Sequence, residues 1–132
     1  MQATTSLKRF FGVRVAAVIA FLVAGIGLFI LGAQPIAVGL FSPPWDKVAH
    51  VGTFALIGGA AGVASGSQGW QRVACCTAGA LALGVADEFH QLYLPGRFAS
   101  WADLLADAAG GIAGAALLHF AQIAKFRHLR NR

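Results

Sequence analysis

The stretch DEFHQLYLPGRFASWADLLAD, residues 87–107, holds four of the five acidic residues in this chain of 132. The fifth, Asp46, opens a second polar run, DKVAH, at residues 46–50. Around these two runs the chain is apolar: 58% of its residues are hydrophobic and 11% are charged, against about 25% charged in soluble domains. A chain this short cannot bury so much apolar surface in one core. Lipid must therefore be the solvent for much of it.

Four apolar segments surround and include these runs, at about residues 10–31, 46–64, 72–94 and 100–124. Each is near the roughly 20 residues that a helix needs to cross a bilayer, and backbone groups in lipid are satisfied only within helices or closed barrels. Pro43-Pro44, a Gly/Ser-rich turn and a Pro-Gly turn separate the four segments. We predict one all-α domain over residues 1–132, a polytopic membrane protein with four transmembrane helices. The first apolar run exceeds the ~7–15 residues of a signal peptide, so we expect it to be retained.

The basic residues predict the orientation of these helices. Four crossings put both termini and the second linker on one side, which carries eight basic residues: Lys8, Arg9, Arg14, Arg72, Lys125, Arg127, Arg130 and Arg132. The other side carries only Lys47 and Arg97. By the positive-inside rule both termini should be cytoplasmic. The basic C-terminal tail is then expected to contact anionic lipid, and no motif supports nucleic-acid binding.

With this topology the polar residues of three helices meet at the outer end. Ten residues form the predicted polar cluster: Asp46, Lys47, His50, Asp87, Glu88, Gln91, Arg97, Ser100, Asp103 and Asp107. Within each segment they recur at helical spacings, so they share one face. An ionisable group facing lipid at a helix centre costs about 2.5–3.5 kcal/mol, so these faces should point toward one another. We expect a polar cavity that opens outward.

The inner half of the predicted bundle has small residues instead. Gly58 and Gly62, and Gly110 and Gly114, form G-xxx-G pairs, which allow close backbone approach. The adjacent Cys75 and Cys76 are expected to pack between helices rather than to pair, because a bridge between neighbours is strained. Tight packing in the inner half argues against a path for proton-coupled transport.

Three motifs within residues 46–114 together resemble those of the VanZ-like family of small bacterial membrane proteins. They are DKVAH, then DEFHQLYLPGR, then SWADLLADAAGG, in the family's order and spacing. Asp107 stands where many members have Asn. The resemblance implies a multi-pass protein of the bacterial cytoplasmic (inner) membrane. The name-giving member confers low-level resistance to teicoplanin, a glycopeptide that acts on cell-wall precursors, so the resemblance also implies a role in the cell envelope and in antibiotic resistance.

The sequence leaves three interpretations of the polar cluster open. In the first, Asp46, Lys47, Arg97 and Asp103 form only a structural ion-pair network. In the second, the cluster binds a lipid-linked or anionic envelope molecule such as a cell-wall precursor. Arg97 and Lys47 would then hold phosphate, while Gln91 and Ser100 would bind sugar or headgroup.

In the third interpretation the cluster belongs to a hydrolase or transferase acting on a polyprenyl-linked substrate. The catalytic candidates are His50, Asp87 and Glu88, since partly desolvated carboxylates and histidine suit acid–base work. The metal-ligand candidates are His50, Glu88 and Asp103. No H-E-x-x-H spacing or nucleophile motif occurs, so the residues identify no cofactor and do not decide between an enzyme and a binding protein.

Overall fold

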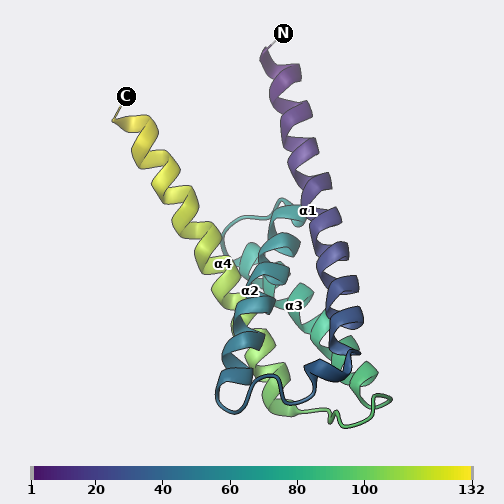
Figure 1. Ribbon diagram of the computed structural model, residues 1–132. Helices are drawn as coiled ribbons and strands as arrows, with labels where there is room; N and C mark the ends of the chain where they lie inside the picture. Colours follow the sequence, from purple (N-terminus) through teal and green to yellow (C-terminus); the bar gives the residue numbers. More distant parts are fainter. Residues whose placement is uncertain (1, 132) are drawn as a thin grey trace.

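The computed structural model describes residues 2–131, and these residues form helices without any strand (Figure 1). The elements are α1 (Gln2–Gly32), the short 3₁₀ turn η1 (Pro35–Ala37), α2 (Trp45–Ser65), α3 (Gly69–Gln91) and α4 (Trp101–Arg130). The prediction of an all-α fold with four long helices is therefore confirmed.

The helix boundaries follow local signals in the chain. Pro44 stands directly before α2, where proline's missing N–H costs nothing. Gly66, with φ of 68°, ends α2 in the left-handed conformation typical of a C-terminal glycine. Two predicted boundaries were wrong: α1 and α4 extend further, from Gln2 and to Arg130, because residues 2–9 and 125–130 contain no glycine or proline to stop a helix.

The predicted end of the third helix was also too late. The helix stops at Gln91 rather than near residue 94. The backbone leaves it through successive turns, in which the N–H groups of Tyr93, Leu94 and Arg97 each donate to the carbonyl three residues earlier. The helix cannot continue through this segment because Pro95 has no N–H to donate. Gly96 adopts a positive φ of 77°, which turns the backbone.

Helices α2, α3 and α4 pack together, and α1 lies along α2 and α3 (Figure 1). Both termini lie at one end of the molecule, where α1 and α4 diverge, and the linkers 33–44 and 92–100 lie at the other end (Figure 1). The core is formed by Phe54, Ile57 and Ala80, against which Phe21 and Leu28 of α1 pack. All three linkers therefore reverse the chain direction, as four antiparallel segments require.

Several glycines lie where helices touch. A Cβ atom on Gly58 would lie 2.8 Å from the carbonyl oxygen of Cys76 and 2.9 Å from the Cα of Gly111. One on Gly110 would lie 2.8 Å from the carbonyl oxygen of Val51. These separations leave no room for a side chain, so the predicted close packing is confirmed. Cys76 is fully buried beside Gly62, and Cys75 and Cys76 are both free thiols, as predicted.

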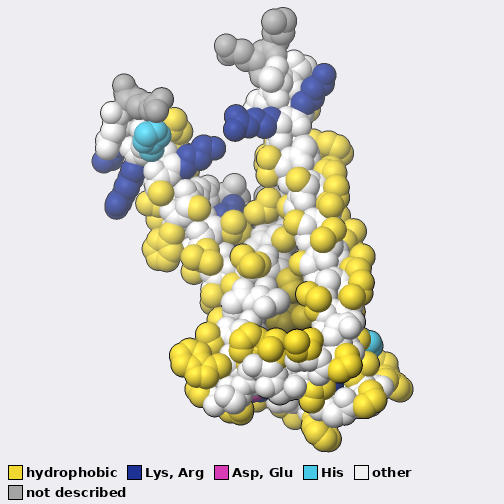
Figure 2. Space-filling view, viewed as in Figure 1, with side chains coloured by type: hydrophobic (Ala, Val, Ile, Leu, Met, Phe, Trp, Pro, Cys, Tyr) yellow, Lys and Arg dark blue, Asp and Glu magenta, His cyan; other side chains and the backbone are white. Residues whose placement is uncertain are grey.

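The outer surface of the molecule is strongly apolar. Large hydrophobic side chains on α1, such as Val23, Ile26 and Ile30, are each more than half exposed, and yellow apolar side chains run along this helix (Figure 2). Among the described residues, three helical stretches are long and apolar enough to cross a membrane: Thr4–Gly32, Trp45–Ser65 and Trp101–Arg130. Continuous exposed apolar surface of this kind marks a lipid-facing protein.

Helix α3 is the exception among the four predicted spans. It is 23 residues long, which at about 1.5 Å per residue is enough to cross the hydrocarbon layer. Arg72 near its start, and Asp87 and Glu88 near its end, leave a shorter apolar stretch between them. Its length therefore suits a span, while its composition falls short of the other three.

Candidate functional site

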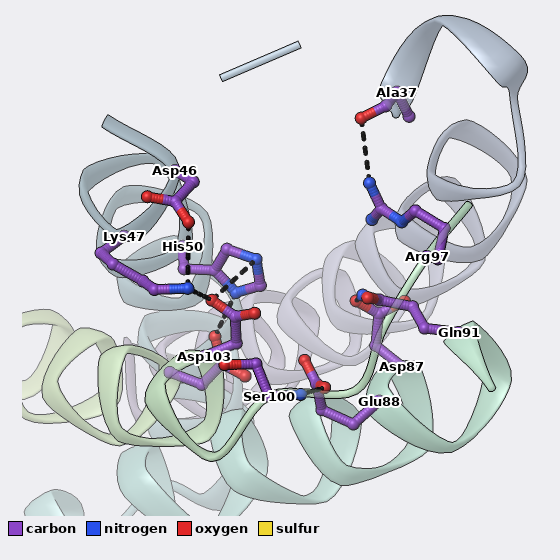
Figure 3. Close-up of polar contacts among 11 residues, drawn as sticks. Ala37, Asp46, Lys47, His50, Asp87, Glu88, Gln91, Arg97, Ser100 and Asp103 are labelled. Atoms are coloured by element: carbon purple, nitrogen blue, oxygen red, sulfur yellow. Dashed lines mark hydrogen bonds and ion pairs between the residues drawn. The ribbon is translucent and has the colours of Figure 1, made fainter. Parts of the chain in front are cut away.

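The ten predicted cluster residues belong to helix ends and a linker at the end of the molecule where the linkers 33–44 and 92–100 lie (Figure 1), and Figure 3 labels all of them except Asp107. They come from the start of α2, the end of α3, the linker after it and the start of α4. Asp87, Glu88, Gln91, Asp103 and Asp107 are each at most 9% exposed. These five side chains are therefore buried inside the protein.

An ion-pair chain joins α2 to α4. The Lys47 Nζ atom lies 3.0 Å from Asp46 Oδ2 and also forms an ion pair with Asp103 Oδ1 (Figure 3). Lys47 is partly exposed, whereas the Asp103 side chain is mostly covered. One lysine thus pairs with two carboxylates and ties the linker ends of the two helices together.

His50 lies one turn deeper and is held by a buried carboxylate. Its Nδ1 atom is 2.8 Å from Asp107 Oδ1, and its Nε2 atom is 3.8 Å from Asp103 Oδ1. The imidazole also stacks on Phe54, with ring centroids 5.9 Å apart. Asp107 is only 1% exposed and is accommodated because the facing residue on α3, Gly84, has no side chain. The orientation of His50 is therefore fixed from three sides.

Glu88 connects α3 to the start of α4. Its Oε2 atom accepts a hydrogen bond from the backbone N–H of Ser100, the residue that precedes α4 (Figure 3). A carboxylate at this place satisfies one of the free N–H groups at a helix start and suits the positive end of the helix dipole. Ser100 thus contributes its backbone rather than the side-chain hydroxyl that the prediction assigned to a ligand.

A third group lies on the other side of the cluster, around Asp87 and Arg97 (Figure 3). The Gln91 side-chain amide donates to Asp87 Oδ2 at 2.9 Å, and Arg97 Nη1 donates to the carbonyl of Ala37 at 2.9 Å. A Cβ atom on Gly32 would lie 3.8 Å from Asp87 Oδ1 and 4.0 Å from Arg97 Nη2. The end of α1 and the first linker therefore close over this group.

Arg97 forms no ion pair with any carboxylate within residues 2–131. The ion-pair network suggested by the sequence thus contains Asp46, Lys47 and Asp103 but not Arg97. Several buried polar atoms of the cluster also lack a hydrogen-bond partner within the described protein, among them Arg97 Nε and Asp87 Oδ1. Buried polar atoms are normally paired, so these two are available to groups outside the protein.

A cavity of about 830 Å³, here called the linker-end cavity, lies beside this cluster. Its polar wall includes Asp46, His50, Asp87, Gln91, Arg97 and Asp103. Its apolar wall comes from α1 and the linkers, and includes Leu28, Leu31, Ile36, Leu40, Phe41 and Phe98. The cavity is therefore amphipathic, with polar side chains on one side and apolar side chains on the other.

Six of the ten candidates line this cavity, and the other four lie behind it. Lys47, Glu88, Ser100 and Asp107 are not among the lining residues; each instead contacts or positions another member of the cluster. The sequence interpretation missed the apolar wall, because no ionisable residue occurs between Arg14 and the end of the first linker to mark this part of the chain. The only available signal was the unusual length of the proline-containing linker.

The metal-ligand candidates are not gathered into one set. Glu88 points to the backbone of Ser100, while His50 and Asp103 belong to the α2–α4 side. In the part of the chain that the structure describes, no three His, Cys, Asp or Glu side chains lie close enough together to hold a metal ion. The arrangement of the residues therefore gives no support to a metal centre made of His50, Glu88 and Asp103.

Together these features define a helical membrane protein with a buried polar cluster and an amphipathic cavity at one end. Residues 4–122 match the protein family described as VanZ/LLP1, and the chain belongs to this family. The match confirms the resemblance carried by the DKVAH, DEFHQLYLPGR and SWADLLADAAGG motifs, all of which lie within it. Comparison with curated proteins and with solved structures gave no match.

Proposed function

We propose that this protein binds the head of a lipid-linked cell-envelope molecule in the linker-end cavity, at the outer face of the bacterial cytoplasmic membrane. The observation that carries the proposal is the amphipathic lining of the cavity. Charged and amide groups on one side of the cavity face apolar side chains of α1 and the linkers on the other. The cavity volume of about 830 Å³ is typical of ligand pockets. A ligand with a polar head and an apolar tail matches both walls.

The proposed orientation has all four helices crossing the membrane and both termini in the cytoplasm. Support for a crossing by α3 comes from its packing: its last turns lie beside the start of α2, and a turn of only three residues joins its beginning to the end of α2. Among the described residues, seven basic residues toward the terminal end against two at the linker end support the direction. The linker-end cavity then opens outward.

The chemistry of the polar wall indicates the kind of head. Arg97 has a partly buried guanidinium whose Nη1 holds Ala37 and whose Nε is unpaired, and a guanidinium fork suits phosphate. Asp46, Asp87 and Asp103 outnumber it, and ionised carboxylates only accept hydrogen bonds. Such acceptors suit hydroxyl groups. A headgroup with a phosphate next to hydroxyl groups or a sugar therefore fits the guanidinium and the carboxylates together better than a bare anion does.

Binding of a polyprenyl phosphate to the full chain in nanodiscs tests the proposal. Arg97→Ala should weaken binding at least tenfold, consistent with the ~1.5–3 kcal/mol of a charge-assisted hydrogen bond. Arg9→Ala removes an equal charge from the exposed start of α1 and should leave binding unchanged. Equal affinity of the Arg97→Ala and unmodified chains, with only lower stability for the variant, would show that the cluster is structural.

The hydrolase or transferase alternative rests on one specific observation, the His50–Asp107 pair. A histidine held at Nδ1 by a buried carboxylate and lining a cavity can accept a proton from an attacking water or hydroxyl. Release of phosphate or transfer of the head group from a polyprenyl diphosphate, measured with and without added divalent metal, tests it. His50→Gln should abolish turnover while leaving binding within about threefold, and absence of turnover under all conditions would leave only the binding function.

The physiological role that we propose is protection or sorting of an envelope precursor, with resistance to a glycopeptide antibiotic as its readout. Expression in a sensitive bacterial host should raise the inhibitory concentration of teicoplanin. The Arg97→Ala variant, at equal membrane abundance, should not. If both chains raise it equally, the linker-end cavity is not the source of resistance.

A further inference from the structure

A second cavity, of about 330 Å³, lies at the opposite end of the molecule from the polar cluster. We call it the terminal-end cavity, since it lies between α1, the turn from α2 to α3, and α4, on the side of both termini. Its charged lining residues are Arg14, Arg72 and Lys125. Apolar side chains complete it, among them Phe10, Val13, Leu118 and Ala121. The close packing predicted for the glycines therefore extends as far as Gly62, which itself lines this cavity.

The three cations of this cavity have no carboxylate to neutralise them. All five acidic side chains of the chain belong to the polar cluster at the other end. Figure 2 shows the same separation as dark blue side chains gathered where α1 and α4 diverge. Cations held close together next to apolar walls repel one another, and an anion between them removes this cost.

Neutral acceptors hold the two arginines in place. Arg14 donates through Nε to the carbonyl of Ala64 and through Nη2 to that of Ser65, each at 2.9 Å. Arg72 donates through Nε to the Ser67 carbonyl at 2.9 Å and through Nη1 to Gln122 Oε1 at 3.0 Å. These bonds fix both guanidinium groups and leave their charge uncompensated.

Lys125 stands apart from the two arginines in its bonding. No hydrogen bond or ion pair of its amine occurs within residues 2–131, although the residue lines the cavity. Arg72 Nη2 likewise donates to no acceptor in the described protein. The cavity thus offers two fixed guanidinium groups and one free amine to a group outside the protein.

We propose that the terminal-end cavity binds the phosphate of an anionic membrane phospholipid, with the acyl chains along its apolar walls. Guanidinium and ammonium donors match phosphate oxygens. Phe10, Val13 and Leu118 match a chain that continues into the bilayer. Basic pockets between helices on the cytoplasmic side are a known kind of site for anionic headgroups. The bound lipid bridges α1 and α4 where the two helices separate.

The test is lipid retention by the full chain, measured by native mass spectrometry after exchange into phosphatidylglycerol or phosphatidylcholine. The unmodified chain should retain phosphatidylglycerol in clear preference. Lys125→Gln should weaken this retention about fivefold, the effect of one basic residue near an anionic surface. The fold should survive, because the Lys125 amine makes no bond within the described protein. The matched control is Arg130→Gln, which removes an equal charge from the exposed end of α4 and should leave retention unchanged.

Three results would overturn the proposal. Equal retention of the two lipids would exclude a headgroup site. Equal losses in Lys125→Gln and Arg130→Gln would indicate general attraction to the basic end of the molecule. Displacement of the lipid by millimolar inorganic phosphate would identify a site for free phosphate. Because Lys125 lies at the far end from Arg97, failure here does not affect the polyprenyl phosphate experiment.

Discussion

At the scale of single residues, the polar cluster combines two kinds of side chain. Lys47, Glu88 and Asp107 are used within the protein, to pair α2 with α4, to hold the start of α4 and to orient His50. Arg97 and Asp87 keep polar atoms unpaired beside the cavity. Structural and binding roles are therefore divided among neighbours, and substitutions can separate them.

Asp107 gives the sharpest stability prediction at this scale. Asp107→Asn keeps an oxygen that can accept from His50 Nδ1, so the free energy of unfolding should fall by less than about 1 kcal/mol. Asp107→Ala removes the only partner that His50 Nδ1 has among the described residues and leaves a small void, so the loss should be about 2–3 kcal/mol. Denaturant unfolding in detergent measures both. Equal losses would mean that the His50–Asp107 bond does not stabilise the protein.

At the scale of the helices, the close approach of α2 to α3 and α4 depends on glycines at particular positions. A methyl group on Gly58 would meet backbone atoms of Cys76 and Gly111, which cannot move without shifting a helix, whereas a methyl group on the next residue, Gly59, would meet nothing within 4 Å. Adjacent residues of one type thus differ completely in their surroundings.

This difference predicts opposite outcomes for one substitution at two neighbouring positions. Gly58→Ala should lower the free energy of unfolding by about 1–3 kcal/mol, the usual cost of overpacking. Gly59→Ala should change it by less than about 1 kcal/mol, or raise it slightly through helix propensity. Thermal unfolding in the same detergent compares them. A tolerated Gly58→Ala would contradict the described helix contacts.

The helices and the meeting place of their polar faces were predictable, whereas the apolar wall was not. Asp46, Asp87 and Asp103 are costly to leave in lipid, and alternating helix direction brings them to one end. Leu31, Ile36 and Phe41 look the same in the sequence whether they face lipid or a cavity, so no pattern shows that the first linker folds over the cluster. The start of α1 and the end of α4 were misplaced because each helix continues past its apolar run into polar and basic residues.

At the scale of the whole molecule, charge divides the protein into two ends. Among the described residues, all five acids and two cations lie at the linker end, and seven basic residues lie toward the terminal end. This asymmetry underlies the proposed orientation, in which the proposed lipid-linked ligand and the proposed anionic phospholipid would lie in opposite leaflets.

Cysteine labelling in intact cells checks the orientation. In a chain whose Cys75 and Cys76 are replaced by alanine, a cysteine at Ser42 should react with a membrane-impermeant maleimide. One at Asn131 should react only after the cells are opened, because the positive-inside rule places this end in the cytoplasm. The reverse pattern, or labelling of both positions from outside, would contradict four crossings with cytoplasmic termini.

Photo-crosslinking with a diazirine-bearing polyprenyl phosphate, mapped by mass spectrometry, tests the central claim of an amphipathic binding cavity most directly. We expect adducts on the cavity wall at Leu31, Ile36 and Phe41, and their loss in Arg97→Ala. Adducts spread evenly over the lipid-facing side of α1, including Ile26 and Ile30, and unaffected by Arg97→Ala, would contradict the claim.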